Sequence, residues 1–393
     1  MQWMLLRGGH VFDPADRGMA DLLVLDGRIV AVGAKLPAPE GIGEGQVLSV
    51  ADRLVLPGLI DGHIHVMGAS GTGGPTTRTT DLQIERIAGA GVTTVISPLG
   101  ADSLSRTIPA LLARAAALTS EGISAYCYTG GWQRPVPTLT GDPQADVVFI
   151  DRVVGVKVAI SEPLAPVYSV KELCGLAHAA YTGGRLAGKG AVLHTHIGDL
   201  PEGLQPLQEV QRRTGIPADR MVATHVNRNP NLWKQALEYA RVGGSIDLTG
   251  MQRPETGHPE AMPAAAAIRE ALAAGIPPSH LTLSTDSGAA YPRFNEEGHA
   301  AGQYMAGPDS LLTTMRELVR DGLTWGQAVS YATRHTADRL GLRLKGRLAA
   351  GCDADVLILT STGEVDCVYG RGRLLVEGGA PIVRGPFEGH AAE

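Results

Sequence analysis

The sequence has few cysteines and no long hydrophobic run, and each absence argues against a class of protein. Four cysteines are scattered over 393 residues without CxxC spacing, so neither a disulfide framework nor a sulfur-ligated zinc site is expected. A membrane span needs about eighteen consecutive apolar residues. Even the alanine-rich segment 261–277 is interrupted by Arg269 and Glu270. We therefore expect no contact with a membrane.

Basic clusters and a signal peptide are also missing. The net charge is −6 and no run of Lys or Arg exceeds two residues, so the chain has no cluster with which to neutralise phosphates and no nucleic-acid partner is expected. The N-terminal MQWMLLRGGH has too short an apolar run for a signal peptide and no small-residue cleavage site. We expect a cytoplasmic protein with a small-molecule partner.

The central part of the chain alternates between β-rich runs and amphipathic helical segments. Hydrophobic residues make up 44% of the chain and charged residues 19%, which is a globular composition. Repeated β/α units over about 250 residues predict a TIM (β/α)8 barrel. The eight candidate strands are 59–66, 91–100, 123–130, 153–161, 191–199, 221–226, 244–250 and 281–288.

The two ends of the chain show a different pattern, because apolar and polar residues alternate there with a period of two. DLLVLDGRIVAVG near the N-terminus and ADVLILT near the C-terminus are typical of strands joined by tight turns. We expect residues 1–55 and 345–393 to form one small β domain, a β-sandwich, beside a barrel of residues 56–344. The alternative is two unrelated β appendages, which is less favourable because an isolated hairpin is only marginally stable.

Polar residues recur where the barrel strands are expected to end. Reactive groups of a TIM barrel lie at the carboxyl ends of its strands, and a spacing of two places side chains on one face of a strand. One histidine alone is usually a core residue, but the convergence of several with a carboxylate favours a metal site for Zn²⁺ or a similar ion. The residues at these ends are His63, His65, Lys157, His194, His196, His225 and Asp286.

Lys157 is the unusual member of this set, because an ammonium cannot ligate a cation and its burial costs free energy. Burial lowers the pKa of a lysine, and a neutral amine beside two metal ions can react with CO₂ to give a carbamate. The alternative is a lysine that extends from the strand to solvent.

Several phrases resemble the amidohydrolase superfamily. PGLIDGHIHVMG, GVK, HTHIGD, THVNRN and LSTDSG occur in this order between VLDGRIVAVG and GCDADVLIL. Within it, GPTTRTT, LGADSLSR, EGISAY, IDRVVGVK and THVNRN resemble the isoaspartyl dipeptidase group over nearly the whole chain. The resemblance implies two divalent ions, most simply Zn²⁺, with carboxylated Lys157 between them. It implies that His63, His65 and Asp286 hold one ion and that His196 and His225 hold the other.

His194 does not match a ligand of the resembled family and is expected to pack or to support a ligand. The resemblance further implies hydrolysis of an amide by metal-activated water. Asp286 would be the base that takes the water's proton and passes it to the leaving amine. Manganese and cobalt also suit this ligand set.

Most of the family's dipeptide contacts are replaced in this chain. The resemblance places its amine-binding glutamate at Thr72 and its carbonyl-polarising tyrosine at Trp132, and only Arg228 keeps its residue. An arginine, a threonine and a serine of the family fall at Leu164, Ala101 and Ala290. A charge left unpaired in a closed site costs several kcal/mol, so we expect a less charged substrate whose single carboxylate meets Arg228.

Three functions are compatible with these features. The first is an isoaspartyl-dipeptidase-like hydrolase of acyclic amides, a metalloprotease or amidase with altered substrate. The second is a hydrolase of cyclic amides such as hydantoins or dihydroorotate. The third is a binding scaffold that has lost catalysis, which the intact set of six ligands disfavours. The resemblance also suggests a homo-oligomer.

Overall fold

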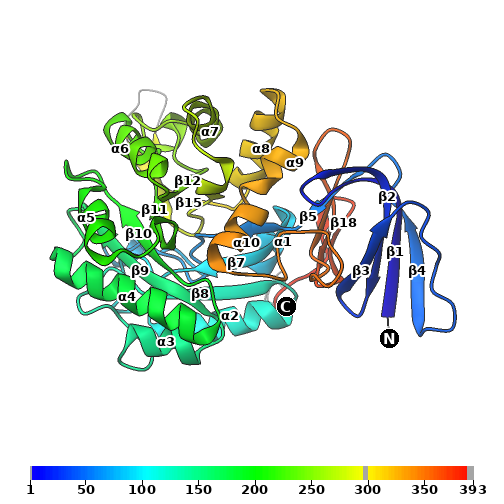
Figure 1. Cartoon of the computed structure of the whole chain (residues 1–393), viewed down its shortest axis with the longest axis horizontal. Helices are drawn as coiled ribbons and strands as arrows, with labels where there is room; N and C mark the ends of the chain where they lie inside the picture. Colours follow the sequence, from blue (N-terminus) through cyan, green and yellow to red (C-terminus); the bar gives the residue numbers. More distant parts are fainter. Residues whose placement is uncertain (1, 295–299, 387–393) are drawn as a thin grey trace.

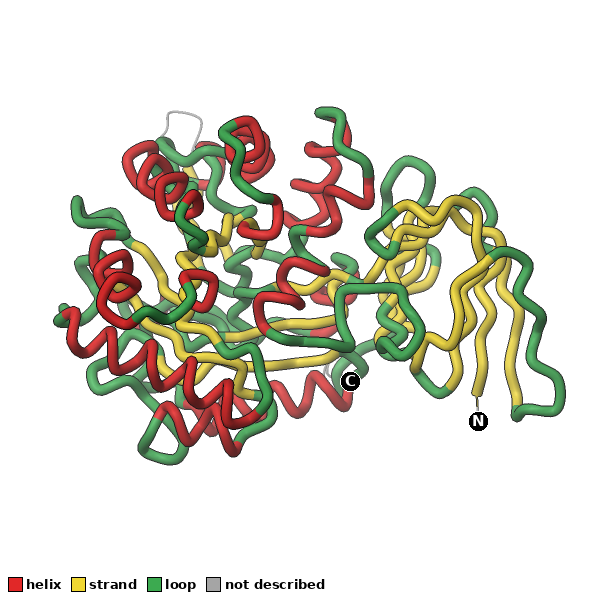
Figure 2. Tube along the Cα trace, in the orientation of Figure 1, coloured by secondary structure: helices red, strands yellow, loops and turns green. Residues whose placement is uncertain are grey.

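Two separate β-sheets organise the chain in a computed structural model that describes residues 2–294 and 300–386 (Figure 1). One sheet is parallel and surrounded by helices, and the other is formed by strands from the two chain ends. Figure 2 separates them clearly, with helices around the strands on one side and strands alone on the other.

The parallel sheet contains all eight strands that the sequence pattern predicts. Its strands are β6 (Leu59–Asp61), β7 (Val92–Ser97), β8 (Ser124–Gly130), β9 (Val153–Ile160), β10 (Val192–Ile197), β11 (Met221–Thr224), β12 (Ser245–Thr249) and β13 (Leu281–Ser284). They lie in chain order, each paired with its neighbour. A parallel bridge from Ile64 to Ser287 joins the first strand to the last. The predicted TIM barrel is confirmed.

Helices cover the outside of this barrel. They are α1 (Ile84–Gly89), α2 (Ile108–Glu121), α3 (Pro143–Phe149), α4 (Val170–Ala187), α5 (Gln205–Thr214), α6 (Pro230–Arg241), α7 (Ala264–Ala273), α8 (Ser310–Arg320), α9 (Trp325–Ser330) and α10 (Arg334–Leu340). In α2, Thr107 caps the N-terminus and Gly122 ends the helix, as helix ends prefer. Among the described residues, no helix is long and apolar enough to cross a membrane.

Four short 3-10 helices lie in the connections, and a β-hairpin follows the last barrel strand. The 3-10 helices are η1 (Pro75–Thr77), η2 (Ala218–Arg220), η3 (Pro254–Thr256) and η4 (Pro278–His280). The hairpin pairs β14 (Ala290–Phe294) with β15 (Ala300–Met305) in antiparallel fashion. It lies between β13 and α8 in the chain, where a loop over the carboxyl ends of the strands is expected in a barrel.

The inside of the barrel changes from apolar to polar along β10. Val192 belongs to an internal apolar cluster that α10 completes through Ala337 and Leu340. His194 and His196 follow Val192 at spacings of two, so their side chains lie on the same face of the strand. The apolar plug therefore closes one end of the barrel and leaves the polar groups at the other.

The second sheet joins the two chain ends. Its strands are β1 (Gln2–Phe12), β2 (Asp16–Leu25), β3 (Arg28–Gly33), β4 (Glu44–Ser49), β5 (Leu54–Pro57), β16 (Val356–Leu359), β17 (Val365–Gly370), β18 (Arg373–Glu377) and β19 (Ala380–Pro381). β5 pairs with β16, for example Val55 with Ile358. The alternative of two unrelated appendages is therefore wrong. The division of the chain at residues 55 and 345 stays a prediction, and residues 387–393 lie outside the described part.

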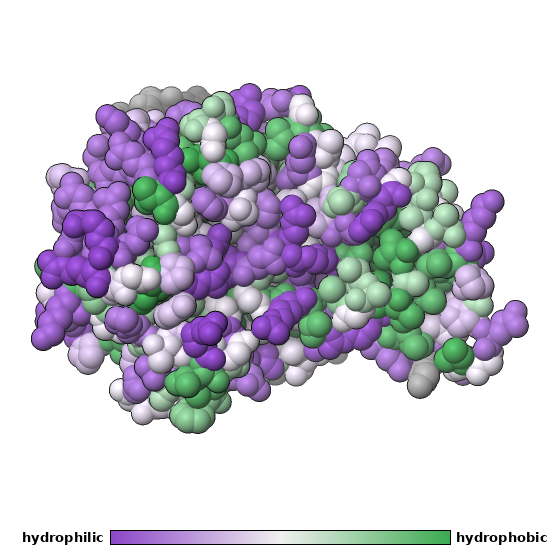
Figure 3. All heavy atoms as spheres, in the orientation of Figure 1, coloured by the Kyte–Doolittle hydropathy of each residue, from purple (hydrophilic) through white to green (hydrophobic). Residues whose placement is uncertain are grey.

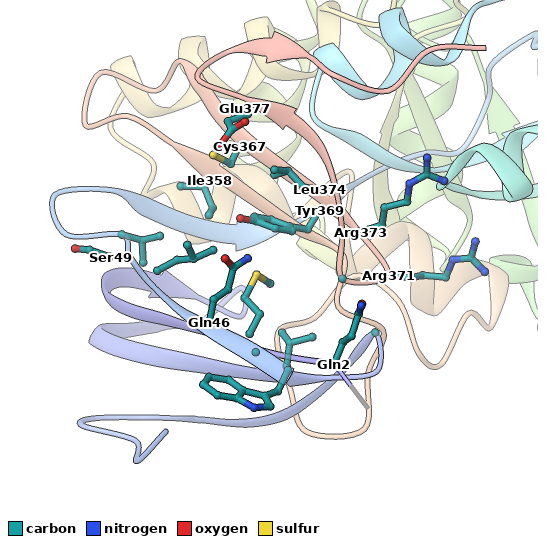
Figure 4. Close-up of a pocket in the computed structure, with 18 of the residues that line it drawn as sticks. Gln2, Gln46, Ser49, Ile358, Cys367, Tyr369, Arg371, Arg373, Leu374 and Glu377 are labelled. Atoms are coloured by element: carbon teal, nitrogen blue, oxygen red, sulfur yellow. The ribbon is translucent and has the colours of Figure 1, made fainter. Parts of the chain in front are cut away.

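This β-sandwich has a cavity of about 1010 Å³ that is partly open to solvent. Figure 4 shows the cavity between β4 on one side and β17 and β18 on the other, with Gln46 and Tyr369 pointing into it. In Figure 3, hydrophobic residues gather on the surface of the same region. None of the residues that line the cavity is among the predicted site residues.

A buried ammonium group ties the small sheet to the barrel. The Nζ atom of Lys345 lies 2.6 Å from Asp355 Oδ2 and 2.7 Å from Asp353 Oδ2, and it donates a hydrogen bond of 2.6 Å to the hydroxyl of Ser124 in β8. Burial alone would lower the pKa of Lys345, but the two carboxylates outweigh this effect and the pKa is raised. Removing the ammonium would leave Asp355 without its counter-charge, whereas Asp353 would keep its ion pair with Arg28 at 2.6 Å.

We expect Lys345→Met to lower the free energy of unfolding by about 3–5 kcal/mol, because breaking a buried ion pair leaves an uncompensated charge. The half-exposed pair of Arg347 with Asp338 provides the control, and Arg347→Met should cost less than about 1 kcal/mol. Urea unfolding of the three proteins measures the difference. Equal midpoints for both variants would contradict the role of Lys345.

Candidate metal centre

Side chains from five barrel strands or their carboxyl ends converge on one place. Lys157 lies on β9, His194 and His196 on β10, and His225 directly follows β11. Asp286 comes two residues after the end of β13. His63 and His65 were expected within the first strand, but β6 ends at Asp61 and the bridge residue Ile64 lies between them.

The distances bring a carboxylate against two imidazoles. Asp286 Oδ1 lies 3.2 Å from His65 Nε2 and 3.6 Å from His63 Nε2, and the two Nε2 atoms are 3.3 Å apart. One ligand atom each of His63, His225 and Asp286 lies within 4.8 Å of the others. His196 is on the far side of His225, at a ring-centroid distance of 4.6 Å.

Three of these rings have a partner on their Nδ1 atom, which leaves Nε2 directed at the cluster. Such a contact fixes both the orientation and the tautomer of a metal-binding histidine. The partners are His194 Nε2 for His63 at 3.1 Å, the carbonyl of Pro98 for His65 at 3.3 Å, and Thr249 Oγ1 for His225 at 2.7 Å. The sequence left the role of His194 open, and its place beside His63 is that of a supporting group. His194 is itself stacked on Tyr128 at a centroid distance of 4.6 Å.

Lys157 is 1% exposed, and its Nζ atom has no hydrogen-bond partner among the described residues. Burial lowers its pKa from 10.5 to about 7, although Asp286 and Asp247 act in the opposite direction. The alternative of a lysine that reaches solvent is therefore wrong. The Nε2 atom of His225 is likewise buried and without a partner in the described part of the chain.

The unpartnered nitrogen atoms of Lys157 and His225 indicate whether the site fits a metal ion. A buried amine or imidazole nitrogen without a partner costs free energy, and imidazole, carboxylate and carbamate are the donors that divalent ions such as Zn²⁺ accept. The residues present therefore fit metal ions.

The backbone is held in an uncommon conformation at two of these positions. His225 has a φ of 67° and Asp286 a φ of 59°, a left-handed region that costs about 1–3 kcal/mol at residues other than glycine. Gly288 has a φ of 85°, and a Cβ atom there would lie 2.2 Å from the carbonyl oxygen of His65. The chain after β13 therefore lies so close to the His63–His65 segment that only glycine fits at position 288.

Two buried acids lie below the cluster. Asp61 accepts hydrogen bonds from Thr285 and from the backbone of His63, and burial raises its pKa to about 7. Asp247 accepts from three hydroxyl groups, and burial raises its pKa despite those bonds. The donors to Asp247 are Thr224 at 2.8 Å, Thr282 at 2.6 Å and Ser284 at 2.5 Å.

The mouth of the site carries a cation between two acids. Arg228 donates to the carbonyl of Ile197 at 3.0 Å, and its Nε atom lies 3.1 Å from Asp199. Glu162 Oε2 lies 3.8 Å from Arg228 and 3.5 Å from His196 Nε2. Burial raises the pKa of Glu162, while Arg228 opposes this shift.

The remaining predicted contact positions are more dispersed. The indole of Trp132 packs edge-on against His196 at a centroid distance of 4.6 Å, and Ala290 begins β14 close to the cluster. Thr72 is exposed, Ala101 is half-buried, and Leu164 is 64% exposed. The structure thus brings Trp132, Arg228 and Ala290 to the cluster, and it leaves Thr72 and Leu164 at the surface.

Sequence reasoning missed Glu162, the acids Asp61 and Asp247, and Tyr291, whose hydroxyl donates to Asp286 Oδ2 at 2.9 Å. The two aspartates had a signal, because an acid inside the apolar runs LIDGH and GSIDLTG needs a buried partner. Tyr291 had no such signal, since its spacing from the other site residues in the sequence does not distinguish it.

Comparisons with known proteins agree with this geometry. The profile of the Amidohydrolase family matches residues 253–375. A solved structure of the beta-aspartyl dipeptidase of Fervidobacterium islandicum AW-1, in complex with beta-Asp-Leu dipeptide, is 31% identical with a TM-score of 0.87. The alignment covers 96% of this chain and 98% of that one.

Shorter or weaker similarities point to cyclic-amide hydrolases. The dihydroorotase of Acetivibrio thermocellus is 42% identical over 65 residues, which are 16% of this chain and only 14% of that protein. The D-hydantoinase of Streptomyces coelicolor is 34% identical over 106 residues, or 26% of this chain and 22% of that protein. The full-length similarity carries the assignment: the chain belongs to the amidohydrolase family of hydrolytic enzymes, as an isoaspartyl-dipeptidase-like member.

Proposed function

We propose that this enzyme is a binuclear metal-dependent hydrolase that cleaves a C–N amide bond in a substrate less charged than an isoaspartyl dipeptide. The observation that carries the proposal is the convergence of four histidines, one carboxylate and one buried lysine at one end of the barrel. This lysine has no hydrogen-bond partner in the described part of the chain. A scaffold without catalysis has no need to keep such a set. In such a scaffold the buried polar groups would lower the stability of the fold and support no activity.

Two ions would be held by separate parts of this set, most simply as Zn²⁺. His63, His65 and Asp286 would hold one ion, His196 and His225 the other, and Lys157 would lie between them as a carbamate. A neutral lysine amine forms the carbamate by attacking CO₂, which makes one N–C bond and releases one proton. Bound divalent ions supply a nucleophilic water at neutral pH and polarise the substrate carbonyl.

Asp286 would be the base that moves the proton. One oxygen, Oδ1, faces His63 and His65, whereas Oδ2 accepts a hydrogen bond from the hydroxyl of Tyr291. The carboxylate can thus hold a cation through one oxygen and accept a proton at the other, then return it to the leaving amine. Its supports keep it in this place: Asp286 N donates to the His63 carbonyl at 2.9 Å.

Arg228 would bind a carboxylate of the substrate. Its present partner Asp199 is 58% exposed, and exposed ion pairs contribute little free energy. A substrate carboxylate can therefore displace Asp199 at small cost and gain a bidentate contact with the guanidinium. Trp132 would cover the same side of the pocket, because its indole already packs on His196.

An amine on the substrate has no comparable partner at the predicted position. Thr72 is exposed and carries no charge, and Glu162, which lies 3.5 Å from His196, already faces Arg228. A free ammonium would thus compete with Arg228 for one carboxylate. This favours substrates whose nitrogen is acylated or part of a ring.

The second candidate is a hydrolase of cyclic amides. The short similarities to a dihydroorotase and a D-hydantoinase favour it, and a ring removes the free amine that the pocket lacks a partner for. We further propose a homo-oligomer, which the resemblance suggests, and a cytoplasmic location.

The proposal predicts about two divalent ions for each chain and a dependence of metal binding on Lys157. Lys157→Ala should hold less metal and lose activity, because the bridging group is gone, and short carboxylic acids should restore part of both. Elemental analysis and a hydrolysis assay measure the two effects. Lys189 donates to three carbonyl groups under α4, so Lys189→Ala is the control and should keep its metal. Full metal content and rate in Lys157→Ala would refute the bridge.

The substrate proposal predicts a ranking on one enzyme preparation. β-Asp-Leu should be hydrolysed with a kcat/KM about 10–100-fold below that of its N-acetylated or a cyclic counterpart, since each unmatched buried polar group costs about 1–3 kcal/mol. Arg228→Met should raise KM for the preferred substrate, and Arg347→Met at the surface should not. Faster turnover of the free dipeptide would show that Glu162 or another group binds the amine.

A further inference from the structure

The phenol of Tyr291 is a buried polar group that the proposed reaction has not yet used. Tyr291 lies on β14, five residues after Asp286, and it is 4% exposed. Its hydroxyl donates a hydrogen bond of 2.9 Å to Asp286 Oδ2. It therefore reaches the ligand cluster from the hairpin that follows the last barrel strand.

This contact makes the two oxygens of Asp286 different. Oδ1 lies 3.2 Å from His65 Nε2 and 3.6 Å from His63 Nε2, while Oδ2 has the Tyr291 hydroxyl. The last torsion of a carboxylate is broad, so its plane can turn easily. A hydrogen bond to one oxygen restrains this torsion and keeps the other oxygen directed at the two imidazoles.

The hairpin holds Tyr291 in place independently of the barrel strands. Ala290 N donates to Ser70 Oγ at 2.6 Å, and Gly288 N donates to the carbonyl of Ala306 at 3.1 Å. The ring itself packs edge-on against His258 at a centroid distance of 5.4 Å. The phenol is thus fixed by the loop after β6, by the segment after β15 and by His258.

We propose that Tyr291 is a positioning residue that fixes Asp286, so that Oδ1 faces the metal ligands and Oδ2 is the oxygen that accepts and returns the proton. The inference rests on the proposed role of Asp286 as the base. Tyr291 keeps its own proton throughout, and the proton that moves comes from the attacking water. The β14–β15 hairpin therefore contributes to the rate without contributing a ligand.

The test is a double-mutant cycle of Tyr291→Phe and Asp286→Asn. Tyr291→Phe alone should lower kcat about 10–100-fold, as the loss of a support of a metal ligand typically does, with KM and metal content nearly unchanged. In the Asp286→Asn background the same substitution should have little further effect, because residues that act as a unit are not additive. Elemental analysis, melting temperature and steady-state kinetics are measured for all four proteins.

Tyr239 provides a matched control, because its buried hydroxyl donates to the carbonyls of Met221 and Ala218 away from the cluster. Tyr239→Phe should lower the melting temperature and keep kcat. Ser70→Ala, which removes the acceptor of Ala290 N, is a second variant and should lower kcat in the same direction by a smaller factor.

The outcomes separate the two proposals. An unchanged kcat in Tyr291→Phe, with a melting temperature lowered as in Tyr239→Phe, would make the phenol merely structural and overturn the inference. Equal effects of Tyr291→Phe with and without Asp286→Asn would show that it does not act through Asp286. Full kcat in metal-loaded Asp286→Asn would instead overturn the proposed base itself.

Discussion

Backbone pairing between the first and the last barrel strand is the constraint on which the centre depends. His65 N donates to the Ser287 carbonyl at 2.7 Å, and Asp286 N donates to the His63 carbonyl at 2.9 Å. These bonds join segments more than 200 residues apart and place a carboxylate directly against two imidazoles. Gly288 permits the approach, since a side chain there would collide with His65. The backbone hydrogen bonds that close the barrel are therefore the same bonds that place Asp286 against His63 and His65.

The same closure brings polar groups into the interior of the barrel. Lys157 and His225 each keep a buried nitrogen without a partner in the described part of the chain, whereas Asp61 and Asp247 are satisfied by hydroxyl and amide donors. Buried polar groups are normally hydrogen-bonded, and within the cluster the amine of Lys157 and the Nε2 atom of His225 are the nitrogens that a bound ion would satisfy.

The sequence predicts the barrel and the cluster well, because both depend on short-range regularities. The alternation of β-rich runs with amphipathic helical segments locates all eight strands, and the carboxyl ends of parallel strands meet at one end of a barrel. Supporting contacts are harder to predict. The bond between His194 and His63 joins strands that are distant in sequence, and Tyr291 reaches Asp286 through a hairpin whose direction no local pattern sets.

Substrate preference is the least predictable property, because it depends on loops rather than strands. Thr72 and Leu164 correspond to charged positions of the resembled family, yet both side chains lie at the surface. Arg228 keeps its residue but is already flanked by Asp199 and Glu162. Its charge is therefore available only to a ligand that displaces an exposed carboxylate. Under the proposed function, the centre would set the class of reaction, and the balance of charge around Arg228 would decide which amide can enter.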